Sequence, residues 1–231
     1  MATKHIGIAA SSAPGAALCY QTLCMEGSAV CGAHNHPEIS MHNHALRHYK
    51  DAFDQGAWLK VGELLLDSAE RLKMIGADFV ICPANTPHQG LDLVRERSPL
   101  PWLHIAEVVA AEAHRLGYRK LGITGTKFLM EGPVYPAKLK AKHIEPIIPP
   151  LEQRTEIDRN IFSELVYMKF LPETLAYYQR VFQDLADAGC DAVVMGCTEI
   201  PLLVKQEHSP IPLLDSTVLL ARAALKYATT D

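Results

Sequence analysis

One short pattern occurs twice in this chain, and this internal repeat most constrains how the chain can fold. Gly76–Thr86 aligns without a gap on Gly189–Glu199, at an offset of 113 residues (189 − 76 = 113). In both copies a Gly-x-Asp sequence precedes a short apolar run, which is typical of a buried strand in a parallel sheet. A second echo places Ile6–Ser11 on Leu121–Thr126, at an offset of 115 (121 − 6 = 115). The nearly equal offsets predict two copies of one α/β unit.

Apolar runs of a few residues alternate with amphipathic stretches along the whole chain. The predicted strands cover residues 5–10, 79–82, 102–105, 120–125, 144–148, 192–195 and 211–214. The predicted helices begin near 16, 172 and 198, lie within 131–142, or cover 58–75, 88–95, 107–116, 155–170 and 217–227. This alternation predicts two pseudo-symmetric parallel-sheet α/β domains that face a shared cleft. We assign residues 1–106 plus 215–231 to the first domain and 107–214 to the second.

Composition and charge argue against several classes of protein. The net charge is −4 and no basic cluster occurs, so we expect no nucleic-acid partner. The longest apolar runs fall far short of a membrane span, and the first residues lack an apolar signal region. The six cysteines show neither a disulfide framework nor zinc spacing. We therefore expect a cytoplasmic protein with no membrane partner.

The second copy of the repeat ends in small and reactive residues. Gly196-Cys197-Thr198-Glu199 follows the apolar run directly, where a strand would pass into a helix. In open α/β sheets, ligands bind at the carboxyl ends of the strands, so Cys197 is expected at the floor of a cleft. The first copy has Ala84 at the matching position (197 − 84 = 113), a methyl group in place of a thiol.

Several of these segments resemble the aspartate/glutamate racemase superfamily. Met195–Leu203 is similar to the second signature of that superfamily. Asn85-Thr86-Pro87-His88 resembles the first, which usually reads Cys-Asn-Thr followed shortly by His. Further matches that extend the similarity over nearly the whole chain are Leu103–Ala106, Gly125-Thr126 and Ile211–Asp215.

The resemblance implies a cofactor-independent amino-acid racemase of the aspartate/glutamate type, acting as a homodimer on a small amino acid or dicarboxylate. Racemisation removes a weakly acidic Cα proton and returns one to the opposite face, which two acid/base groups do most directly. Cysteine suits this role because its pKa, ordinarily near ~8.5, is easily lowered at a helix N-terminus. Cys197 is therefore the predicted catalytic residue.

A second set of residues is predicted to bind the substrate. Small loop residues before a helix suit a carboxylate, because unpaired N–H groups point outward there. Arg47 could hold a carboxylate through its planar guanidinium group. The predicted substrate-binding residues are Ser11, Arg47, Asn85, Thr86, Thr126, Thr198 and Glu199.

Ala84 occupies the position of the expected first cysteine and cannot transfer a proton. The alanine could be an engineered replacement, or a neighbour could supply the second proton; the neighbours are Thr86, Cys82, His88 and His104. A third alternative is one-faced chemistry, as in the similar one-cysteine arylmalonate decarboxylases. The chain could also be a dicarboxylate-binding protein that lost catalysis.

Residues 34–48 are rich in histidine, with His34, His36, His42, His44 and His48. Two His-Asn-His triplets could suggest a metal site, but neither a carboxylate nor a cysteine in this stretch completes a recognisable ligand pattern. We therefore expect solvated histidines or histidines at the rim of the active site, and no metal.

Overall fold

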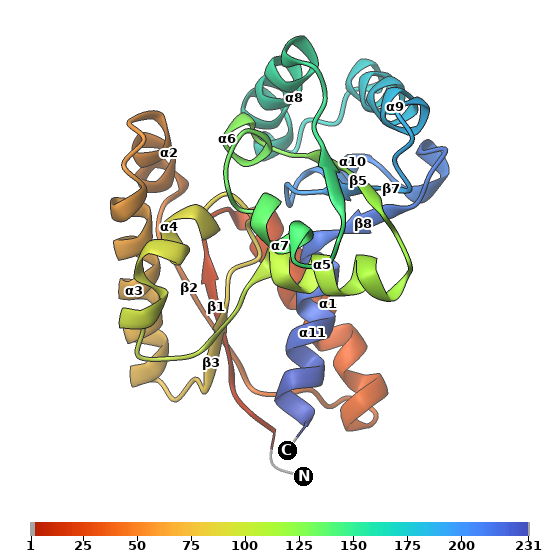
Figure 1. Ribbon diagram of the computed structural model, residues 1–231. Coiled ribbons are helices and arrows are strands. Elements are labelled where there is room, and N and C mark those ends of the chain that lie inside the picture. The colour runs from red at the N-terminus through yellow and green to blue at the C-terminus, as the bar shows by residue number, and fades with distance from the viewer. Residues whose placement is uncertain (1–2, 231) are drawn as a thin grey trace. The chain divides into compact units, whose positions relative to one another are not determined.

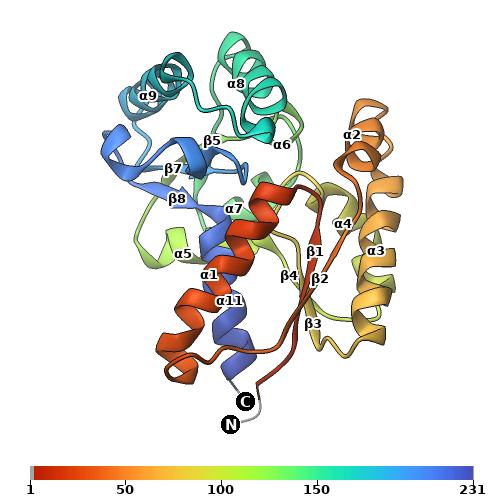
Figure 2. The same ribbon diagram turned by 180° about the vertical axis from the view of Figure 1, so that it is seen from behind.

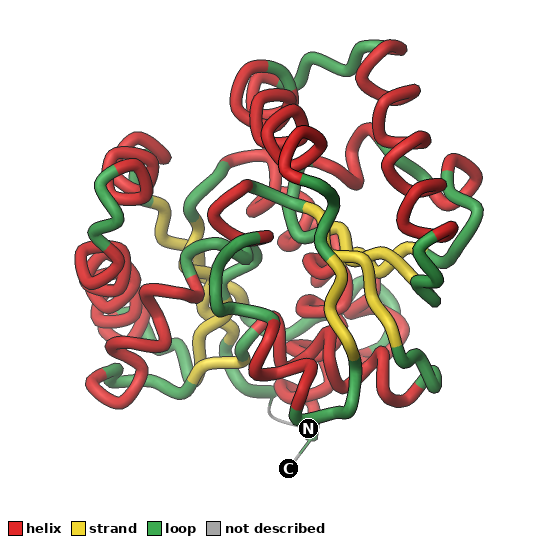
Figure 3. Tube along the Cα trace, turned by 45° about the horizontal axis from the view of Figure 1, so that its top comes forward, coloured by secondary structure: helices red, strands yellow, loops and turns green. Residues whose placement is uncertain are grey.

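The computed structural model of this protein describes residues 3–230 and divides into two compact units. The first comprises residues 1–108 with 217–231, and the second residues 109–216. Each unit contains its own four-stranded parallel sheet with helices packed on it, as the separate groups of yellow strands in Figure 3 show. The predicted α/β class with parallel sheets is confirmed.

The first unit is built on a sheet of strand order β2-β1-β3-β4. Its strands are β1 (Ile6–Ala10), β2 (Ile39–Asn43), β3 (Phe79–Ile81) and β4 (Trp102–Leu103). Its helices are α1 (Ala13–Cys31), α2 (Leu46–Asp54), α3 (Trp58–Met74), α4 (His88–Val94) and the 3₁₀ turn η1 (Arg95–Arg97). The chain passes into the second unit through α5 (Ile105–Arg115) and returns through α11 (Ser216–Thr229).

Apolar residues on both faces of β1 and β3 explain why helices cover this sheet on two sides. Ile6 and Ile8 of β1 are fully buried and share a core with Leu23 of α1 and Leu220 of α11. Figures 1 and 2 show α1 and α11 on one side of the sheet and α3 with α4 on the other. A strand covered on both faces is a continuous run of apolar residues, and this run makes the strand recognisable in the sequence.

The second unit repeats this plan with strand order β6-β5-β7-β8. Its strands are β5 (Lys120–Thr124), β6 (Glu145–Ile147), β7 (Ala192–Met195) and β8 (Leu213–Asp215). Its helical segments are α6 (Lys127–Met130), α7 (Pro136–Lys140), α8 (Leu151–Ser163), η2 (Leu165–Tyr167), α9 (Pro172–Asp187), α10 (Ile200–Leu203) and η3 (Gln206–His208).

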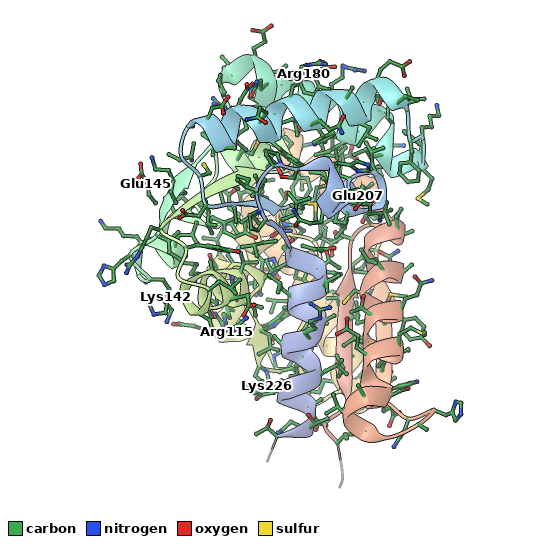
Figure 4. All side chains as sticks on the ribbon, turned by 90° about the vertical axis from the view of Figure 1, so that its right-hand side faces the viewer. Arg115, Lys142, Glu145, Arg180, Glu207 and Lys226 are labelled. Atoms are coloured by element: carbon green, nitrogen blue, oxygen red, sulfur yellow. The ribbon has the colours of Figure 1, made fainter. Side chains whose placement is uncertain are left out.

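The core of the second unit lies between β7 and the helix pair α8 and α9. Ile161 of α8, Phe182 of α9 and Val193 of β7 are buried together in one cluster. Charged residues of the same helices face outward, as Arg180 of α9 does in Figure 4. Amphipathic spacing therefore places α9 with its apolar face on the sheet.

The repeated Gly-x-Asp sequence forms the same bonds in both units. Gly76 has φ +94° and Gly189 has φ +83°, which favours glycine after a helix. Asp78 accepts from the backbone N–H of His5 at 2.6 Å, and its own N–H donates to the carbonyl of His5 at 2.9 Å. Asp191 accepts from the N–H of Lys120 at 2.8 Å and donates its N–H to the carbonyl of Lys120 at 2.8 Å. The sequence echo thus reflects one structural device used twice.

Some predicted element bounds were wrong, for local reasons. The helix predicted over 155–170 begins at Leu151 and ends at Ser163, and Met168, which lies beyond its end, is 54% exposed with φ +57°. Ile75 is likewise exposed, since α3 ends at Met74 before the turn at Gly76. β2 and α2 were not predicted, because the histidine-rich stretch lacks an apolar run. Of the helices within residues 3–230, none combines the length and apolar character needed to cross a membrane.

Two glycines determine how closely α4 packs on α3. A Cβ on Gly62 would lie 2.6 Å from the carbonyl oxygen of Gly90, a distance that real Cβ atoms do not reach. We expect Gly62→Ala to lower the free energy of unfolding by ~1–3 kcal/mol, because the obstructing atom is backbone and the overpacked helices must separate.

Urea unfolding followed by circular dichroism measures this effect. Lys60→Ala is the matched control, since Lys60 is an exposed residue of the same helix, and its change should stay within ~0.5 kcal/mol. A Gly62→Ala protein as stable as the parent would show that α3 and α4 can separate without loss.

Candidate functional site

The thiol of Cys197 lies in the turn at the carboxyl end of β7. Its side chain is buried, with 7% exposed, and its Sγ donates a hydrogen bond to Oε2 of Glu199 at 2.9 Å. The hydroxyl of Thr198 donates to the same oxygen at 2.7 Å. The other carboxylate oxygen of Glu199, Oε1, is buried and accepts no hydrogen bond from any residue between 3 and 230. The turn thus joins a thiol to a carboxylate that keeps unused acceptor capacity.

The surroundings of Cys197 keep it protonated at neutral pH. Burial raises the pKa of the Cys197 thiol well above its ordinary value, and the negative charge of Glu199 raises the same pKa further. The backbone N–H of Glu199 acts in the opposite direction, because it donates toward the sulfur and stabilises the thiolate. Cys197 is therefore a neutral thiol at this pH.

Two glycines hold the Cys197 turn against the end of β5. The N–H of Gly196 donates to the carbonyl of Thr124 at 2.8 Å. A Cβ on Gly196 would lie 2.6 Å from that same carbonyl oxygen, and a Cβ on Gly125 would lie 3.0 Å from the carbonyl oxygen of Gly196. The side chain of Leu129 is also close to both glycines, so backbone and side-chain atoms together leave no room for a Cβ at either position.

The predicted threonines of the second unit lie in these same two turns. Thr126 caps α6, because its Oγ1 accepts from the N–H of Leu129 at 3.2 Å. Both Thr126 and Thr198 are buried, with 7% and 3% exposed. Because β5 and β7 are adjacent parallel strands, the two threonines occupy the same edge of the sheet as Cys197.

The corresponding turn of the first unit follows β3. Asn85 and Thr86 are buried, and Ala84 is half-buried. Cys82 is fully buried, its Sγ contacts the carbonyl of Ala84 at 3.5 Å, and burial raises the pKa of Cys82 to about 12. The Cys82 thiol therefore stays protonated at neutral pH, and its hydrogen points at the backbone of its own loop.

His88 uses both ring nitrogens to hold the turn in place. Nδ1 lies 2.9 Å from the carbonyl of Ala84, and Nε2 accepts from the N–H of Ile105 at 3.3 Å. These partners place the proton on Nδ1 of a neutral ring. Burial lowers the pKa of His88 well below its ordinary value, and the nearby His104 lowers it further. His88 therefore supports the loop that contains Ala84.

His104 packs against His88 with ring centroids 4.5 Å apart. Its Nδ1 accepts from the N–H of Ala106 at 3.2 Å, which starts α5 at Ile105 and explains why the predicted strand 102–105 is shorter. Its Nε2 lies 3.4 Å from Oδ1 of Asp92, a contact without hydrogen-bond geometry.

Ser11 and Arg47, the two remaining predicted residues, have different settings. Ser11 is 4% exposed at the carboxyl end of β1, the neighbour of β3, so it shares a sheet edge with Asn85 and Thr86. Arg47 lies on α2, with 86% of its side chain exposed, and its Nε is 3.5 Å from Oδ2 of Asp51.

Some residues of these surroundings were not predicted. Tyr178 of α9 is fully buried, its hydroxyl has no hydrogen-bond partner among residues 3–230, and burial raises its pKa well above the ordinary value. Its position between Leu175 and Phe182 at helical spacing was the available signal. The structure also gathers His42, His44 and Asp67 within 4.8 Å of one another as a candidate metal cluster.

Comparison with known proteins places these features in a family. A candidate Asp/Glu racemase from Yersinia pestis has a similar structure, with 29% identity, a TM-score of 0.87, and coverage of 98% of this chain and 100% of that one. An aspartate racemase homologue from Pyrococcus horikoshii is 28% identical with a TM-score of 0.81, covering 98% and 100%.

A sequence relative is the broad specificity amino-acid racemase of Bacillus subtilis. It is 24% identical over 161 residues, which is 70% of this chain and 69% of that protein. Residues 13–224 match the sequence model of the Asp/Glu/Hydantoin racemase family. Because this match includes both strand-end turns and the cysteine of the second, the chain belongs to the Asp/Glu/Hydantoin racemase family.

Proposed function

We propose that this protein is a cofactor-independent amino-acid racemase that uses Cys197 as an acid/base, with aspartate, glutamate or a related small amino acid as substrate. The observation that carries the proposal is the hydrogen bond from the Cys197 thiol to the buried carboxylate of Glu199, 2.9 Å long, at the end of a central strand. One relative is described as a broad specificity amino-acid racemase and another as an aspartate racemase homologue, which supports the substrate class.

The proposed chemistry begins with two proton transfers. Cys197 passes its proton to Glu199, and the thiolate takes the Cα proton of the substrate while the C–H electron pair stays on carbon. The resulting carbanion is stabilised as an enediolate by hydrogen bonds to the substrate carboxylate. A proton returned by Cys197 to the same face gives exchange, and a proton returned to the opposite face gives inversion.

Buried polar residues support recognition of the substrate. Asn85, Thr86 and Ser11 follow the carboxyl ends of strands in the sheet of the first unit. Thr126 and Thr198 do the same in the sheet of the second unit. Hydroxyl and amide groups at such positions can bind carboxylates.

The first turn favours a second candidate function, in which chemistry occurs on one face only. Ala84 offers no exchangeable proton, and both Cys82 and His88 are buried and bonded to the backbone of their own loop. Cys197 alone would support proton exchange, or protonation of a carbanion formed by decarboxylation. A binding protein without turnover is the remaining alternative, and the predictions below separate the three.

All six cysteines are free thiols. The cytoplasmic location and the homodimer implied by the family resemblance stay predictions.

Cys197→Ala should abolish Cα exchange, since general acid–base catalysis by one group contributes ~10²–10⁴-fold. Deuterium incorporation from heavy water into L-aspartate, L-glutamate and other amino acids, followed by NMR, measures the rate. Cys190→Ala is the matched control, because Cys190 is a buried thiol of the same unit. Exchange that survives in Cys197→Ala contradicts the proposal, as does dicarboxylate binding by the parent protein without any turnover.

Glu199→Gln should separate two effects of Glu199 on the Cys197 thiol, namely the effect of its charge on the thiol pKa and its role as acceptor of the thiol proton. Removing the negative charge lowers the pKa of Cys197, so the pH midpoint of its alkylation should fall. Exchange should nevertheless slow by ~10²-fold or more, because an amide cannot accept the thiol proton. Mass spectrometry of the Cys197 peptide gives the midpoint, and Glu207→Gln, an exposed site of the same unit, is the control. An unchanged exchange rate would remove Glu199 from the mechanism.

Ala84→Cys should raise racemisation much more than one-faced exchange, because it restores the acid/base group that the first family signature usually contains. Chiral chromatography follows inversion while NMR follows exchange on the same samples. Ala84→Ser is the matched control, since it adds a polar atom that ionises far less readily than a thiol. If the unmodified protein already exchanges and racemises at equal rates, another residue serves the second face, and Cys82, His88 and His104 become the next to mutate.

A further inference from the structure

A second cluster of chemically reactive side chains lies in the first unit, apart from the residues used above. One ligand atom each from His42, His44 and Asp67 lies within 4.8 Å of the other two. His42 belongs to the edge strand β2, His44 follows that strand, and Asp67 lies on α3. All three side chains are partly buried, which gives them a defined setting and access to solvent.

His44 and Asp67 are already in contact. Nε2 of His44 lies 2.8 Å from Oδ2 of Asp67, yet this nitrogen forms no hydrogen bond with any residue in the described range 3–230. At 2.8 Å the two atoms are closer than two ligands of a tetrahedral zinc ion, which lie about 3.4 Å apart, so a bound ion would move them slightly apart. Zinc binds imidazole nitrogen at ~2.0–2.1 Å and carboxylate oxygen at ~2.0–2.2 Å.

His42 is oriented by a buried serine. Ser68 is fully buried and its hydroxyl donates to the carbonyl of Leu64 at 3.0 Å, so its oxygen accepts from Nδ1 of His42 at 3.0 Å. This bond places the imidazole proton on Nδ1 and leaves the lone pair on Nε2. Metal-binding histidines typically donate their other ring N–H to such a partner, which fixes the tautomer.

Asp67 has an outer partner as well. Its two carboxylate oxygens accept from Nε and Nη2 of Arg71 at 2.8 and 3.1 Å. A cation bound at Oδ2 would retain the contact between Oδ1 and Arg71 and displace the one between Oδ2 and Nε. The positive charge of Arg71 weakens cation binding, so the two imidazoles must supply much of the affinity.

We propose that His42, His44 and Asp67 bind a divalent first-row transition-metal ion. Two imidazole nitrogens and one carboxylate oxygen suit Zn²⁺, Ni²⁺ and Cu²⁺, and disfavour Mg²⁺ and Ca²⁺, which prefer all-oxygen sites. The largest ligand separation must shorten by roughly 1–1.5 Å to meet zinc distances, which rotation of half-buried side chains allows. The ion links the edge strand β2 to α3 and keeps at least one position for water. This site is independent of the proposed racemase chemistry.

Titration calorimetry with Zn²⁺ and Mg²⁺, on protein without an affinity tag, tests the proposal. Zn²⁺ should bind one equivalent and Mg²⁺ none. His42→Gln and His44→Gln should each lower the Zn²⁺ association constant by at least ~10-fold. Removal of a residue that only hydrogen-bonds a metal ligand already costs ~10-fold or more, and removal of the ligand itself should cost at least as much. Ser68→Ala should lower it by ~10-fold through His42 while leaving all three ligands in place.

His34→Asn is the matched control, because His34 is exposed in the same histidine-rich stretch and asparagine tolerates its φ of +60°. Its zinc affinity should equal that of the parent. Zn²⁺ should also raise the unfolding temperature of the parent and of His34→Asn, but not of His44→Gln. Absence of zinc binding, or equal affinity in the parent and His44→Gln, overturns the proposal whatever the outcome of the exchange measurements.

Discussion

The architecture of both units depends on one interaction, an aspartate that joins the start of a central strand to its neighbour. Asp78 pairs with the backbone of His5, and Asp191 pairs with the backbone of Arg119 and Lys120. Each bond fixes the register of two parallel strands at the end where they begin. Because strand length is short, that register also determines where the strands end and where their turns present side chains. The position of Cys197 therefore follows from contacts at the opposite edge of the sheet.

The two turns differ in chemistry although their backbones arise in the same way. In the second unit a thiol donates a hydrogen bond to a buried carboxylate. In the first unit Ala84 occupies the corresponding position. Nδ1 of His88 and Sγ of Cys82 both contact its carbonyl oxygen. The polar atoms around Ala84 are thus directed at the backbone, where they support the loop. The two units thus share a backbone frame but differ in the reactive groups of their turns.

Much of this could be predicted from the sequence, because buried parallel strands are continuous apolar runs. β7 matches its predicted bounds, and the match of Gly76–Thr86 on Gly189–Glu199 identified both turns. β2 was missed, since this edge strand is exposed on alternate residues and its polar sequence resembles a loop. The partners of His88 and the approach of Asp67 to His44 depend on tertiary packing between distant segments. The periodicity of apolar residues and the spacing of motifs in a sequence do not predict such contacts.

The glycine contact between the ends of β5 and β7 limits how this protein could be altered. Gly125, with φ +155°, and Gly196 meet backbone atoms of the opposing turn at distances that leave no room for a side chain. Saturation libraries at these two positions should consequently yield few folded variants.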